Sequence, residues 1–317
     1  MTRRSLLGAG KTPSGKVDGM SREVTEAHYL HERSGLEPVL QAPVSNPTAL
    51  KWVPGRDQLI AATRDGDLVE VDPVLGTRVI AEELGETAVL DIHRDRSRYL
   101  AVSRTGNWRV GTLKGELLFE GEHKFLSGMM GLMADKHAVL VGDEADHRVL
   151  KVISLQARKV TGTVRLPPRV ICVLAEKTRR PLLARSTAAG LSVVPLGKEA
   201  KFPPGLESTA HRLRPAGDYV LGFTATGICV WGQQGGVPRS MRLPDLTAGD
   251  IGRAGQYLGL GMRNGAVALA RMDRMEKRVR PDLVRAFDGP VTSVAFSSKG
   301  RWLATGAEGL RLWGWEE

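Results

Sequence analysis

VTSVAFSSKGRWLATGAEGLRLWGW, residues 291–315, is the stretch that determines how this chain is expected to fold. Its three short apolar runs, SVAF, WLATG and LRLW, are separated by the polar turns SSKGR and AEG. Short apolar runs between clusters of Ser, Gly and charged residues are typical of antiparallel strands, and glycine suits the turns because it tolerates a positive φ angle. This stretch therefore predicts three consecutive antiparallel strands.

The same pattern occurs seven times along the chain. An apolar run, a polar turn and a second apolar run begin at residues 49, 88, 128, 170, 209, 250 and 291, so successive starts lie 39, 40, 42, 39, 41 and 41 residues apart. Further apolar runs supply a third and a fourth strand, as at 104–113 and 115–121. A period of about 40 to 45 residues with this pattern is typical of propeller blades. We predict an all-β fold, a seven-bladed β-propeller of four-stranded antiparallel blades.

A family resemblance follows from these residues. Residues 286–315 resemble a WD-repeat blade in their order of strand, Ser/Gly turn, small-residue strand and Leu-Trp ending, and residues 48–80 and 209–232 are similar to it in part. The chain departs from the family pattern at Phe287, where a histidine is expected, and at Gly232 and Gly314, where an aspartate would follow tryptophan. The resemblance implies a WD-repeat-like propeller that acts as a scaffold in a multiprotein complex.

Closing the ring requires one more strand. The last repeat has three strands before Glu317, whereas residues 35–44, GLEPVLQAPV, precede the first repeat without a blade of their own. We predict that residues 36–42 form the outer strand of the last blade, because this pairing removes an exposed sheet edge. Residues 35–317 are the predicted propeller. Residues 1–34 are the predicted N-terminal arm, partly disordered and with at most a short helix.

Two N-terminal motifs resemble known signals without meeting their requirements. TRRSLLG at 2–8 resembles a twin-arginine export signal, but its apolar stretch is shorter than the roughly 7 to 15 residues that a signal needs. GAGKT at 8–12 resembles a phosphate-binding loop, but Ser5 stands where that motif requires glycine. We therefore expect neither export nor nucleotide binding at these residues.

Composition indicates a basic protein of a reducing compartment. The chain has 45 Lys and Arg against 35 Asp and Glu, a net charge of +10, which favours an acidic partner. Cys172 and Cys229 lie in separate apolar runs, as expected for buried reduced thiols. The mean hydropathy of -0.17 is too polar for a membrane protein. We expect a cytoplasmic location and no membrane partner.

Propeller geometry predicts where the charges lie. The turns between the first and second and between the third and fourth strands of each blade share one face of the ring. We predict that this basic face binds the partner through Arg94, Arg96, Arg98, Arg158, Lys159, Lys177, Arg179, Arg180, Arg274, Lys277, Arg278 and Arg280. The same reasoning places Arg214 on this face and Asp250 on the opposite, more acidic face. Two alternatives stay open: the basic residues only solubilise the turns, or they contact nucleic-acid phosphates.

The sequence predicts no catalytic, cofactor or metal site. Asp91, His211, Asp250 and Asp288 lie singly near the ends of predicted inner strands, and we interpret them as turn or core residues. His28 and His31 have helical spacing, but no third metal ligand lies near them in sequence.

Three methionines lie close together in the third repeat. Met129, Met130 and Met133 fall on a predicted inner strand, where thioethers usually fill gaps in the core, so we interpret them as core residues rather than a binding groove. The sequence therefore predicts a non-catalytic protein-interaction scaffold that docks an acidic protein on its basic face. The alternative is a nucleic-acid-binding subunit that contacts phosphates through the same face.

Overall fold

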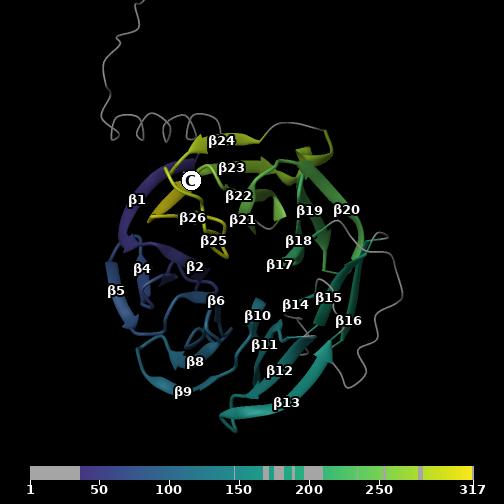
Figure 1. Cartoon of the computed structure of the whole chain (residues 1–317). Coiled ribbons are helices and arrows are strands. Elements are labelled where there is room, and N and C mark those ends of the chain that lie inside the picture. The colour runs from purple at the N-terminus through teal and green to yellow at the C-terminus, as the bar shows by residue number, and fades with distance from the viewer. Residues whose placement is uncertain are drawn as a thin grey trace, which may run out of the picture.

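The fold is a ring of antiparallel blades around a central axis, as Figure 1 shows. The computed structural model describes residues 36–145, 147–166, 171–174, 182–187, 190–195, 210–233, 235–252, 255–277 and 281–315. The described strands form seven blades, which confirms the predicted all-β, seven-bladed propeller. The predicted N-terminal arm lies outside the described residues.

The first three blades have four strands each, given from the axis outward. Blade one is β2 (Pro47–Trp52), β3 (Leu59–Thr63), β4 (Leu68–Asp72) and β5 (Gly76–Ala81). Blade two is β6 (Thr87–Ile92), β7 (Arg98–Ser103), β8 (Asn107–Thr112) and β9 (Leu117–Glu122). Blade three is β10 (Ser127–Met133), β11 (His137–Asp143), β12 (Arg148–Ser154) and β13 (Lys159–Leu166).

Blade four has three strands within the described residues, namely β14 (Ile171–Leu174), β15 (Leu182–Thr187) and β16 (Gly190–Pro195). Blade five is β17 (Arg212–Ala216), β18 (Tyr219–Thr224), β19 (Gly227–Gly232) and β20 (Gly235–Arg242). A bridge between Leu191 of β16 and Gly236 of β20 joins the sheets of blades four and five. Blade six is β21 (Leu246–Gly252), β22 (Tyr257–Met262), β23 (Ala266–Arg271) and β24 (Asp282–Arg285), with the 3-10 helix η2 (Met272–Lys277) between its last two strands.

Blade seven confirms the predicted ring closure. Its strands from the axis outward are β25 (Ser293–Phe296), β26 (Trp302–Gly306), β27 (Gly309–Trp315) and β1 (Leu36–Ser45). β1 pairs antiparallel with β27 from Leu36 opposite Trp315 to Ser45 opposite Gly309, so the strand is three residues longer than predicted. The register shifts twice, once after Pro38 and once across Pro43. Proline has no N–H to donate to the ladder, so such shifts suit an outer strand.

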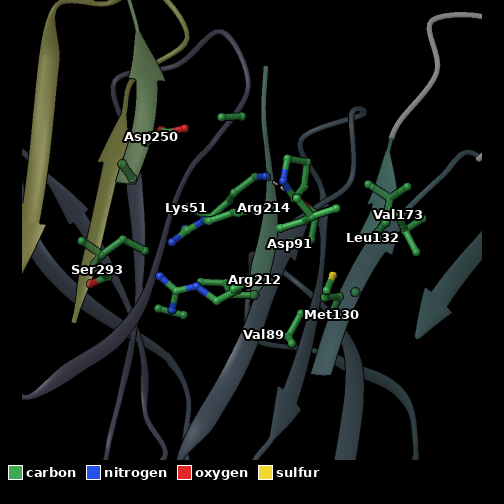
Figure 2. A pocket seen from close by; sticks show the side chains of 18 of the residues that line it. Lys51, Val89, Asp91, Met130, Leu132, Val173, Arg212, Arg214, Asp250 and Ser293 are labelled. Atoms are coloured by element: carbon green, nitrogen blue, oxygen red, sulfur yellow. Dashed lines mark ion pairs between the residues drawn. The ribbon is translucent and has the colours of Figure 1, made fainter. Parts of the chain in front are cut away.

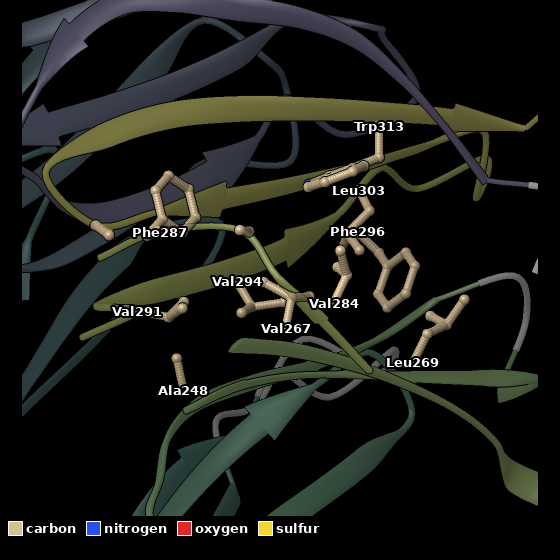
Figure 3. Close-up of a cluster of buried hydrophobic side chains, with 12 residues drawn as sticks. Ala248, Val267, Leu269, Val284, Phe287, Val291, Val294, Phe296, Leu303 and Trp313 are labelled. Atoms are coloured by element: carbon tan, nitrogen blue, oxygen red, sulfur yellow. The ribbon is translucent and has the colours of Figure 1, made fainter. Parts of the chain in front are cut away.

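Apolar side chains between neighbouring blades form the core. Between blades six and seven, Val267, Leu303 and Trp313 are fully buried, and Figure 3 shows the cluster they form with Phe296 and neighbouring side chains. Each such side chain contributes on the order of 1.5–3 kcal/mol of burial free energy. The Trp313 indole donates a hydrogen bond of 3.0 Å to the Thr305 hydroxyl, so glycine at position 314 does not leave this buried N–H without a partner.

One glycine shows why the turns are so rich in this residue. Gly106, in the turn between β7 and β8, has a φ angle of +94°, which side chains other than glycine rarely adopt. A Cβ atom at this position would lie 1.8 Å from the carbonyl oxygen of His123, in the loop that leads to the next blade. The turn thus packs backbone against backbone where two blades meet, and only glycine fits.

Candidate binding site in the axial cavity

A cavity of about 1100 Å³ lies on the axis of the ring. Its walls are the inner strands β2, β6, β10, β14, β17, β21 and β25, which contact one another around the axis. The cavity is lined by residues at the starts of these strands, such as Thr48 and Thr247, and by residues beyond their ends, such as Pro54 and Ser298. It therefore runs along the axis from one face of the ring towards the other.

The first polar pair in this wall is Lys51 of β2 and Asp91 of β6. The Lys51 ammonium lies 2.8 Å from the Asp91 carboxylate, and this carboxylate raises the pKa of Lys51 above its usual value. The other carboxylate oxygen of Asp91 accepts a hydrogen bond of 2.8 Å from the backbone N–H of Met133. Asp91 is buried and joins the inner strands of blades one, two and three.

Asp250 of β21 has a similar structural role between blades six and seven. Its carboxylate accepts a hydrogen bond of 2.7 Å from the backbone N–H of Phe296. Burial raises the pKa of Asp250 above its usual value, because a carboxylate loses solvation among packed strands; the charges of Arg214 and Lys51 act in the opposite direction. Ionisation of Asp250 therefore costs free energy, and the backbone N–H of Phe296 holds its carboxyl group in place.

Two arginines of β17 supply half of the cavity's remaining basic side chains; the other two are Arg104 and Arg148. Arg212 and Arg214 are two residues apart on the strand, so both side chains project from the same side of it, and Figure 2 shows both extending into the cavity. The Arg212 guanidinium lies 4.1 Å from the centre of the Phe223 ring and donates a hydrogen bond of 2.5 Å to the carbonyl oxygen of Thr247. Burial and the charge of Arg214 lower the pKa of Arg212 to about 10.

Apolar side chains also line the cavity. Met130 is half-buried, whereas Val89, Leu132 and Val173 are almost completely buried in the cores between blades two, three and four. The predicted core role is confirmed for Met133, which is buried between blades two and three. Met129 and Met130 are half-buried; they pack against the cores between neighbouring blades and also line the cavity. The cavity therefore has charged side chains on several blades, and the half-buried Met129 and Met130 add apolar surface on blade three.

Several side chains that the sequence left scattered come together in this cavity. Asp91, His211 and Asp250 all line it, whereas Asp288 is exposed in the loop before β25. The predicted assignment of Arg214 and Asp250 to opposite faces is wrong, because both lie within inner strands rather than in turns.

The predicted basic residues of blade two are largely engaged with carboxylates. Arg94 forms an ion pair with Asp135, and Arg98 lies 2.6 Å from Asp95. Burial alone would raise the pKa of Asp95, but hydrogen bonds from Ser97 and Arg98 outweigh it and hold this pKa well below the usual range. These arginines therefore connect turns to one another. Arg96 adopts a φ angle of +63°, and its guanidinium packs close to Gly55 of blade one.

The other described members of the predicted basic face lie far apart around the ring. Arg158 and Lys159 are exposed where β13 of blade three begins, and Arg274 is exposed on η2 of blade six, which lies on the other side of the ring in Figure 1. Lys277 is the last residue of η2. The remaining predicted residues lie outside the described residues: Lys177, Arg179, Arg180, Arg278 and Arg280.

The described part of the chain holds neither a metal cluster nor a membrane-spanning helix. No three described His, Cys, Asp or Glu side chains gather where they could hold a metal ion, and the His28 and His31 pair lies outside the described residues. No helix among the described residues is long and apolar enough to cross a membrane. No protein-family model matches the chain, and no curated protein matches it.

Proposed function

We propose that this chain is a non-catalytic, WD-repeat-like scaffold of a cytoplasmic multiprotein complex, and that it docks an acidic partner protein through basic turns. The observation that carries the proposal is the closed ring itself, in which β1 and β27, the first and last described strands, pair in one blade. Turns held by such a ring present side chains in fixed positions, so a partner binds them with little loss of conformational entropy. The net charge of +10 supports an acidic partner.

The docking residues that the described structure supports best are Arg158 and Lys159. Both are exposed at the turn between β12 and β13. Arg158 adopts a φ angle of +54° in this turn. Two neighbouring cations at the rim can pair with a partner's carboxylates and accelerate association more than they strengthen the final complex.

Reversal of these charges tests the proposal. The double substitution Arg158→Glu and Lys159→Glu should lower the yield of proteins that co-purify with the native chain by about tenfold or more, with an unchanged melting temperature. The matched control is Arg64→Glu with Arg263→Glu, two exposed arginines in turns of the other face. Equal capture by both double variants would refute docking at this turn.

The net charge of +10 also supports a second candidate, a nucleic-acid-binding subunit. In this case nuclease treatment should release the co-purifying material, and the affinity for a short duplex should fall steeply as salt rises, because binding releases counterions. Capture that survives nuclease and changes little with salt would contradict this candidate and favour a protein partner.

A further inference from the structure

We propose that the axial cavity is a binding site for a small organic monoanion, a carboxylate attached to an apolar chain or ring. The carboxylate would lie against Arg212 and Arg214, and the apolar part would contact the half-buried Met129 and Met130. This inference is independent of the proposed scaffold role, because it concerns the purified chain alone.

The charges of the wall favour one negative charge in the ligand. The described lining contains five basic side chains and four carboxylates, a formal sum of +1. The basic residues are Lys51, Arg104, Arg148, Arg212 and Arg214, and the acidic residues are Asp91, Asp143, Asp218 and Asp250. Glu86, outside this lining, already pairs with Arg104, and burial disfavours the charged form of Asp250. The Asp91 carboxylate in the wall repels a dianion such as a phosphate monoester more strongly than a monoanion.

Most of the other cations in the wall are already engaged with carboxylates. Lys51 pairs with Asp91 at 2.8 Å, Arg104 pairs with Glu86 at 2.9 Å, and Arg148 lies 3.6 Å from Asp143. The two arginines of β17 differ from these: Arg212 donates its hydrogen bond to the neutral carbonyl of Thr247, and Arg214 acts through its charge on the buried Asp250, whose carboxylate accepts from backbone. They are the cations best placed to receive an added anion.

The geometry of β17 brings the two guanidinium groups towards the same anion. Because they project from one side of the strand, their positive charges repel, and the lowered pKa of Arg212 reflects this repulsion together with burial. A carboxylate placed between them would remove the repulsion and accept hydrogen bonds from both planar groups. In a partly desolvated cavity, such charge-assisted hydrogen bonds are stronger than at the open surface.

The size and the apolar surface of the cavity suit a small molecule. Ligand pockets are usually clefts of about 300–1000 Å³ with mainly apolar walls and a few polar groups that fix orientation, and this cavity of about 1100 Å³ lies close to that range. The half-buried Met129 and Met130 stand on β10 of blade three, whereas the two arginines stand on β17 of blade five. A ligand that contacts both strands therefore has an anionic end and an apolar body.

Isothermal titration of the purified full chain with decanoate tests the proposal, with decyl phosphate and decanol as charge analogues. We expect saturable binding of decanoate at one site, with decanol and decyl phosphate each weaker by about tenfold or more. Absence of decanoate binding at millimolar concentration would overturn the proposal. Decanol or decyl phosphate binding as tightly as decanoate would also overturn it.

Matched variants locate the site. Arg214→Gln should weaken decanoate about tenfold or more, whereas Arg263→Gln, at an exposed turn arginine, should leave binding unchanged. Met130→Ser should weaken decanoate by a smaller factor while the preference over decanol persists, because it removes only apolar contact. The melting temperature of each variant verifies folding. If Arg214→Gln folds and binds decanoate as the unmodified chain does, the assignment to β17 is wrong.

Discussion

Truncation of Val44 in the closing strand tests how the ring is held shut. Val44 is 4% exposed and packs with Leu50, Trp52 and Leu310, so it connects blade seven to blade one. Val44→Ala removes two buried carbons, at about 0.8 kcal/mol each. The cavity left behind raises the expected loss of unfolding free energy to about 2–3 kcal/mol.

The same strand provides the control. Val39 is 46% exposed, so Val39→Ala should change the free energy of unfolding by about 0.5 kcal/mol or less. Denaturant unfolding followed by circular dichroism measures both variants, and hydrogen exchange of the β27 amides reports whether the seam opens locally. We expect faster exchange in β27 than in β11 for Val44→Ala. Equal losses for the two variants, or a loss below about 0.5 kcal/mol for Val44→Ala, would refute the reasoning.

Three further predictions follow from single residues. Gly106→Ala should lower the free energy of unfolding by more than about 3 kcal/mol or prevent folding. The control Gly76→Ala has a similar φ angle of +95° but no atom within 4 Å of the added Cβ, so it should lower the free energy of unfolding by only about 1–2 kcal/mol. Thermal unfolding compares the two variants, and equal losses would contradict the close approach at Gly106. Burial raises the pKa of Cys172 to about 12, so its thiol should react with a disulfide reagent at neutral pH only after unfolding; rapid labelling of the native chain would contradict this burial. Burial raises the pKa of Asp250 in the folded state, so ionisation of this carboxyl destabilises the fold as pH rises. Asp250→Asn still accepts the hydrogen bond from the Phe296 N–H and should be at least as stable as the unmodified chain at neutral pH, with an advantage that shrinks towards about pH 4. A lower melting temperature of the variant at neutral pH would contradict this direction.

The period of the repeats made the ring predictable. Each repeat has the turn and strand pattern of one small sheet that cannot bury its own faces, so seven of them must stack. The closing strand was predictable for the same reason. The last repeat lacked an outer strand, and the apolar segment 35–44 belonged to no other blade, so this segment could supply it. The register within the closing strand was harder to predict. The pairing of β1 with β27 shifts across Pro43, and the strand extends to Ser45 instead of ending at residue 42.

The candidate site was harder to predict from the sequence than the fold was. Lys51, Asp91, Arg214 and Asp250 lie on four blades, and nothing in their local sequence distinguishes an inner-strand position that faces the axis from a position in a turn. The distribution of charges along the sequence predicts basic turns, but it does not reveal which of those cations have carboxylate partners in the folded chain. The ion pair of Arg94 with Asp135 joins residues of two blades, 41 positions apart.

The sequence by itself determined the all-β architecture, the number of blades and the pairing of residues 36–42 with the last blade. These features depend on periodicity and on strand count, which are properties of the order of residues. Only the tertiary structure decided which side chains meet on the axis and which cations already have carboxylate partners. Those contacts depend on small rotations between blades and on the register of each inner strand. A shift of one residue in a strand turns every side chain to the other side.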